Sequence, residues 1–86
     1  MHWLSLNEGQ ALKSLRTPQH QELLRRLEAA RVKAGLTQTA LAKILGRQQS
    51  FVAKYEGGER RLEVMEFVQI CKALGVSPAQ ILRGIS

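Results

Sequence analysis

The sequence predicts an all-α domain built from five short helices. Residues that favour helix dominate the composition, only two prolines interrupt it, and no stretch keeps an alternating apolar and polar pattern. The 86 residues suit a single domain, and 44% hydrophobic content is enough for a folded core. Only residues 1–16 are weakly patterned, so we expect a weakly structured arm before a helical domain over residues 17–86.

Helix start and stop signals place the individual helices. Helices are expected at residues 18–34, 38–45, 49–56, about 63–74 and 78–83. Thr17, Thr37 and Ser77 supply capping hydroxyls, and prolines follow the first and the last of these. The helices are expected to end at the glycines Gly35, Gly46, Gly57, Gly58 and Gly75.

Apolar residues recur at helical spacing and predict the buried faces. The expected inward residues are Leu23, Leu27, Ala30, Ala34, Leu41, Ala42, Ile44, Leu45, Val52, Tyr55, Val64, Phe67, Ile70 and Leu74. Cys71 lies in the same apolar stretch as Ile70, which indicates a core thiol; as the sole cysteine, it excludes an internal disulfide.

Residues 38–57 satisfy the demands of a tight helix-turn-helix. The crossing helices need a small contact residue, which Ala42 supplies, and a turn residue that accepts positive φ, which Gly46 supplies. Leu41, Val52 and Tyr55 provide apolar anchors on both helices. A chance pair of amphipathic helices would rarely meet all these requirements at fixed spacing.

Charge points to a polyanionic partner, and several other classes of function lack support. The formal charge is +6, from 13 Lys and Arg against 7 Asp and Glu, which favours nucleic acid. His2 and His20 are isolated surface residues without metal-ligand spacing, so neither a metal nor a cofactor is expected, and no enzyme signature is present. No apolar run approaches the roughly 20 residues of a membrane span. The first ten residues lack the plan of a signal peptide, so a cytoplasmic protein is expected.

Three segments together resemble a known family. "LTQTALAKILG", then "YEGGER", then "ICKALGVSPAQIL" are similar to the lambda-repressor-like, Cro/C1-type (XRE) helix-turn-helix domains of phage and bacterial regulators. The resemblance covers about residues 20–83. It implies a compact five-helix lambda-repressor-like fold whose second motif helix, residues 49–56, enters the DNA major groove.

The resemblance also implies which residues bind DNA. The expected set is Gln38, Arg47, Gln48, Gln49, Ser50, Phe51, Lys54, Arg60 and Arg61. Gln48, Gln49 and Ser50 take the base-reading positions, and a glutamine amide can bond adenine in a bidentate way. Gln38 and Arg47 are expected at phosphates.

Some of these assignments leave alternatives open. Glu59 stands where family members often carry a basic residue, so the phosphate role moves to Arg60 and Arg61, although Arg61 also fits a solvated face. Phe51 either touches a thymine methyl or sugar, which we favour, or covers the domain. Ala40 replaces a frequent acidic residue, which leaves the capping box of its helix incomplete.

A structural ion pair and a dimer complete the expectations. Arg31 and Glu56 match an arginine and a glutamate that pair in related domains, which implies a partly buried pair that fixes the angle of the reading helix. The alternative is two unrelated surface charges. We expect a sequence-specific double-stranded DNA-binding transcriptional repressor. It would bind a palindromic operator as a homodimer, through Ile81, Leu82 and Ile85 or through the arm. The alternative is a protein-interaction module of the same fold, such as an antitoxin or an adaptor.

Overall fold

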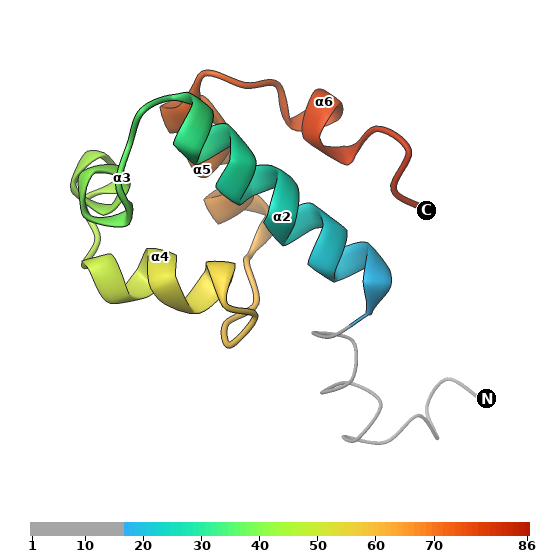
Figure 1. Ribbon diagram of the computed structural model, residues 1–86, viewed down its shortest axis with the longest axis horizontal. Coiled ribbons are helices and arrows are strands. Elements are labelled where there is room, and N and C mark those ends of the chain that lie inside the picture. Colours follow the sequence, from blue (N-terminus) through green and yellow to red (C-terminus); the bar gives the residue numbers. More distant parts are fainter. Residues whose placement is uncertain (1–16) are drawn as a thin grey trace.

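The computed structural model describes residues 17–86, and the expected arm at residues 1–16 lies outside this range. The described chain consists of five helices without strands, as the sequence predicts (Figure 1). Their bounds are α2 Pro18–Lys33, α3 Gln38–Leu45, α4 Gln49–Glu56, α5 Val64–Leu74 and α6 Pro78–Leu82. Each lies within about one residue of its predicted bounds, so the local start and stop signals determine the helices.

Predicted caps begin and end the helices. The hydroxyl of Thr17 accepts a hydrogen bond from the His20 N–H at 3.1 Å, and that of Thr37 accepts one from the Ala40 N–H at 3.0 Å. Gly46 ends α3 with φ of +69°. A Cβ at Gly46 would meet no described atom within 4 Å, so the backbone angle and not space requires glycine there.

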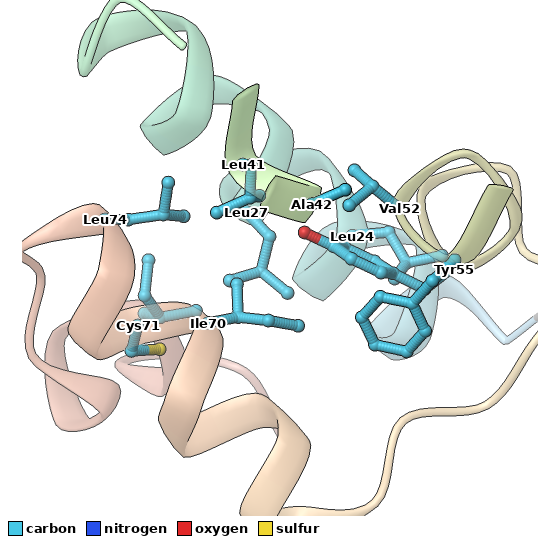
Figure 2. Close-up of a cluster of buried hydrophobic side chains, with 11 residues drawn as sticks. Leu24, Leu27, Leu41, Ala42, Val52, Tyr55, Ile70, Cys71 and Leu74 are labelled. Carbon is cyan, nitrogen blue, oxygen red and sulfur yellow. The ribbon is translucent and has the colours of Figure 1, made fainter. Parts of the chain in front are cut away.

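The core lies where α2, α3, α4 and α5 converge, and α6 adds Ile81 to it (Figure 2). It consists of Leu24, Leu27, Leu41, Ala42, Phe51, Val52, Tyr55, Ile70, Cys71, Leu74 and Ile81. Ala42 is buried, and α3 packs closely against α4, as the small-residue argument predicts. The buried thiol of Cys71 is also confirmed, and burial raises its pKa.

Three residues expected to face the core are exposed instead. Val64 is 77% exposed and Ile44 57% exposed. Val64 is the first residue of α5, before the turn on which Phe67 and Ile70 pack inward. Ala34 is also exposed because it caps α2 beyond its last turn. Helical periodicity identifies an apolar face, but it does not tell where along that face the neighbouring helix stops.

The Tyr55 side chain is fully buried, and its hydroxyl points into the apolar cluster (Figure 2). Among the described residues, this hydroxyl has no hydrogen-bond partner. Burial raises the pKa of Tyr55, so the phenol stays neutral. The ring therefore stabilises the core by packing, while the hydroxyl adds no bond.

Candidate nucleic-acid interface

Helix α4 presents a polar edge to solvent and an apolar edge to the core. Gln48, Gln49, Ser50 and Lys54 are exposed, whereas Val52 and Tyr55 are buried. Gln48 is the N-cap of α4, but its side chain makes no capping bond. The residues that the sequence assigned to base reading thus share the accessible beginning of one helix, which lies beside α3 at one end of the molecule (Figure 1).

An ion pair joins α2 to the end of α4. Arg31 Nε donates to Glu56 Oε2 at 2.7 Å, and Arg31 Nη2 donates to Glu56 Oε1 at 3.2 Å. Arg31 Nη1 also donates to the Leu36 carbonyl at 2.8 Å. The side chains are only 11% and 4% exposed, so the predicted partly buried pair is present. Its hydrogen bonds to Glu56 raise the pKa of Arg31.

Gln38 extends this ion pair to the exposed end of α4. Its Nε2 donates to Glu56 Oε1 at 2.9 Å, and its Oε1 accepts from Gln49 Nε2 at 2.8 Å. We call Arg31, Glu56, Gln38 and Gln49 the reading network. Through it, a side chain exposed at the start of α4 is connected to a buried ion pair at its end. The sequence did not suggest this role for Gln38, whose phosphate contact stays a prediction.

Phe51 is not the exposed flanking residue that the sequence favoured. It is 8% exposed and packs edge-on against Tyr55, with ring centroids 5.5 Å apart. The expected contact with a thymine methyl or sugar was therefore wrong, and covering the domain is correct. The signal was available, because Phe51 lies four residues before Tyr55 and so shares its helical face.

Two of the predicted phosphate-binding arginines meet at this ring. The guanidinium carbon of Arg47 lies 3.9 Å from the Phe51 ring centroid, and that of Arg60 lies 4.8 Å from it. Both also bind the carboxylate of Glu66, a buried residue of α5 that sequence reasoning missed. We call Arg47, Phe51, Arg60 and Glu66 the arginine cluster.

Arg61 lies on a different surface. With His20, Leu62 and Phe67 it lines an apolar groove between α2, α5 and α6, so the structure does not bring it together with the reading network. His20 is half-buried there and is not simply a surface residue. Burial, with a contribution from the Arg61 charge, lowers the pKa of His20.

Ile81 is 8% exposed and belongs to the core, so it is unavailable as a dimer contact. Leu82 is 46% exposed and Ile85 half-buried, which leaves both accessible at the end of the chain.

The described residues contain no group of acidic, cysteine or histidine side chains that could hold a metal ion. None of the helices between residues 17 and 86 is long and apolar enough to cross a bilayer.

The comparisons with known proteins agree with this geometry. A family described as a helix-turn-helix domain matches residues 22–83. The chain belongs to the XRE-type helix-turn-helix family. It is similar to the solved structure of an XRE-family like protein from Pseudomonas syringae pv. tomato str. DC3000, with 45% identity and a TM-score of 0.77. That match covers 87% of this chain and 92% of the other. None of the curated proteins matches.

Membership in this family confirms the predicted relationship and supports a DNA-binding regulator. The helix-turn-helix is a DNA-binding motif whose second helix commonly lies in the major groove, and α4 takes the place of that second helix here. Which of its side chains bind bases and which bind phosphates stays a prediction.

Proposed function

We propose that the protein is a sequence-specific transcriptional repressor that reads the DNA major groove with α4. The reading network is the observation that carries this proposal. It ties the exposed amide of Gln49 through Gln38 to the buried Arg31–Glu56 pair. A base-reading side chain held in one orientation loses less conformational entropy on binding than a free one. Repression follows from occupancy of the operator, which needs no contact beyond the DNA itself.

The bonding pattern of Gln49 leaves the groups that adenine requires. Its Nε2 carries two hydrogens, and Gln38 accepts one of them. The second hydrogen and the Oε1 acceptor remain for adenine N7 and for the adenine amino group. Bidentate reading is therefore compatible with the bond to Gln38, and the proposal assigns base discrimination to Gln49.

The test begins with selection of bound sites from a random duplex pool. Gln49→Ala is then titrated against the selected site and a scrambled duplex at matched salt, with Gln19→Ala, an exposed glutamine on α2, as the control. Loss of a bidentate base contact is expected to cost about 1–3 kcal/mol at the selected site and almost nothing at the scrambled one. Gln19→Ala is expected to bind both duplexes like the wild type.

Two outcomes would contradict the proposal. Equal loss at both duplexes would mean that Gln49 does not read bases. Failure of the wild type to bind any duplex would remove the DNA-binding function and favour the protein-interaction module, as in an antitoxin or adaptor.

The proposal includes a homodimer on a palindromic operator, with the apolar groove as the contact surface. The groove has a volume of about 640 Å³, and Val64 on its wall is 77% exposed. Arg61 and Glu63 carry opposite charges on the same groove. In a twofold interface every contact between two different residues occurs twice, once from each copy. Arg61 of each copy can therefore pair with Glu63 of the other.

Sedimentation of two matched variants tests the dimer. Val64→Glu places a charge on the groove, whereas Ile44→Glu places the same charge on an exposed apolar residue outside it. We expect a dimer for the wild type and for Ile44→Glu, and a monomer for Val64→Glu. A Val64→Glu dimer as tight as the wild type would exclude this surface.

A further inference from the structure

The arginine cluster joins three parts of the chain around one carboxylate. Arg47 comes from the turn between α3 and α4, Arg60 from the loop after α4, and Glu66 from the first turn of α5. Arg60 Nη1 and Nη2 donate to Glu66 Oε1 and Oε2 at 2.8 and 2.9 Å, and Arg47 Nη1 donates to Oε2 at 3.3 Å. Oε1 also accepts from the backbone N–H of Glu63 at 3.0 Å. One buried carboxylate therefore fixes two guanidinium groups beside Phe51.

Both arginines keep donors available for a further ligand. A guanidinium carries five N–H donors. Within the described residues, Arg47 uses one of them, for Glu66. Arg60 uses three, two for Glu66 and one for the Arg61 carbonyl. The Arg47 and Arg60 side chains are 39% and 35% exposed, while Glu66 is almost completely covered. The accessible part of the cluster is therefore cationic and rich in donors.

The location of the cluster indicates what this ligand is. Phe51 belongs to the first turn of α4, two residues after Gln49. A duplex whose base edges reach Gln49 brings its phosphates to the flanks of the same helix end. Guanidinium groups match phosphate oxygens in geometry and charge. The carboxylate has two opposed effects here, because it repels a phosphate but orients the two cations that attract it.

We propose that Glu66 is a positioning residue for DNA backbone binding, which holds Arg47 and Arg60 so that both bind phosphate beside the reading helix. This inference rests on the proposed DNA-binding function. It assigns an acidic, buried side chain a favourable role in binding a polyanion. From net charge alone, removing the negative charge of Glu66 should strengthen DNA binding, whereas the proposal predicts weaker binding. The direction of the change in affinity therefore tests the proposal.

The experiment compares Glu66→Gln with Glu59→Gln. Both substitutions raise the net charge by one, but Glu59 lies exposed in the loop after α4 and forms no ion pair within the described residues. Binding to the selected duplex and to the scrambled duplex is measured over a range of salt concentrations. Glu59→Gln is expected to bind as tightly as the wild type or more tightly. Glu66→Gln is expected to bind both duplexes about tenfold more weakly, with a salt slope reduced by about one.

Circular dichroism of both variants establishes that each is folded at the temperature of the titration. Arg47→Lys tests the proposal independently if Glu66→Gln does not fold. The substitution keeps the positive charge but removes the planar guanidinium with its several donors, at a partly exposed site. It is expected to weaken binding to both duplexes several-fold. The inference is overturned if folded Glu66→Gln binds like Glu59→Gln, or if Arg47→Lys binds like the wild type. Both of these results concern variants and leave the proposed function intact. The proposed function itself would be refuted if the wild type bound no duplex.

Discussion

Removing either partner of the Arg31–Glu56 pair tests how the position of α4 is maintained. Glu56→Ala leaves a guanidinium that is 11% exposed without its two bonds to the carboxylate, and Gln38 loses its acceptor as well. Breaking a buried pair costs about 3–5 kcal/mol. Because the exposed edge of Arg31 admits some water, we expect a value near the lower end, about 3 kcal/mol.

That cost is large for this domain. Small proteins have about 0.05–0.15 kcal/mol of stability per residue, which gives roughly 4–13 kcal/mol for 86 residues. In a domain of this size about 1 kcal/mol shifts the melting temperature by roughly 4–8 °C, so each single variant is expected to melt roughly 12–24 °C lower. Arg31→Ala leaves the carboxylate of Glu56 in the same situation and is expected to have a similar effect.

Urea unfolding of the two single variants and of the double variant measures the coupling between the partners. The double variant strands neither charge, so its loss is expected to be clearly smaller than the sum of the two single losses. Arg25→Ala serves as the control, because it removes a 71% exposed arginine that pairs with Glu22 on the same helix and is expected to cost less than about 1 kcal/mol. Single losses no larger than that of Arg25→Ala, with an additive double variant, would refute the reasoning.

Three further predictions concern the core and the arginine cluster. Ala42→Leu is expected to lower the free energy of unfolding by about 1–3 kcal/mol in urea unfolding, because the close packing of α3 and α4 leaves no room for the larger side chain. A loss below about 0.5 kcal/mol would show that the two helices can separate to accommodate it. Tyr55→Phe is expected to leave the melting temperature unchanged or higher, since its hydroxyl bonds to none of the described residues, and a clear decrease would reveal a bond. The hydrogen bonds from Arg60 lower the pKa of Glu66 to about 2, so its ionised form stabilises the fold above the ordinary carboxyl pKa, and this contribution is lost as the pH falls toward 2. Urea unfolding at pH 7 and pH 3 is expected to show a smaller acid-induced loss for Glu66→Gln than for the wild type; equal losses would contradict the reasoning.

The features that sequence reasoning predicted well depend on neighbouring residues. Thr17 and Thr37 cap helices through bonds to residues three positions away, and Gly46 adopts the backbone angle that a tight turn requires. These are local requirements, so the sequence displays them directly. The burial of Ala42 also follows locally, because the lengths of α3 and α4 and the turn between them leave few ways to cross.

The features that it missed depend on distant parts of the chain. Glu66 lies 19 positions from Arg47, and their pairing depends on the packing of α5 against α3. The bond between Gln38 and Gln49 likewise depends on the crossing of α3 and α4, which fixes the distance between two side chains on different helices. Phe51 is a different case, because its apolar character fits either a base contact or the core, and its spacing of four residues from Tyr55, which favours the core, was given too little weight.

The bond between Gln38 and Gln49 has a consequence for altering the DNA target of this domain. In a library that varies position 49 alone, every new side chain lies beside the unchanged amide of Gln38. Only some side chains can form a hydrogen bond with that amide. Because Gln38 Nε2 donates to Glu56, its Oε1 is the group that faces position 49 and needs a donor. Aspartate or an apolar residue at position 49 would leave this oxygen without its donor, whereas arginine can supply one from a longer side chain. Under the proposed function, positions 38 and 49 are expected to determine specificity together, and randomising both at once is expected to yield binders that selection at one position at a time misses.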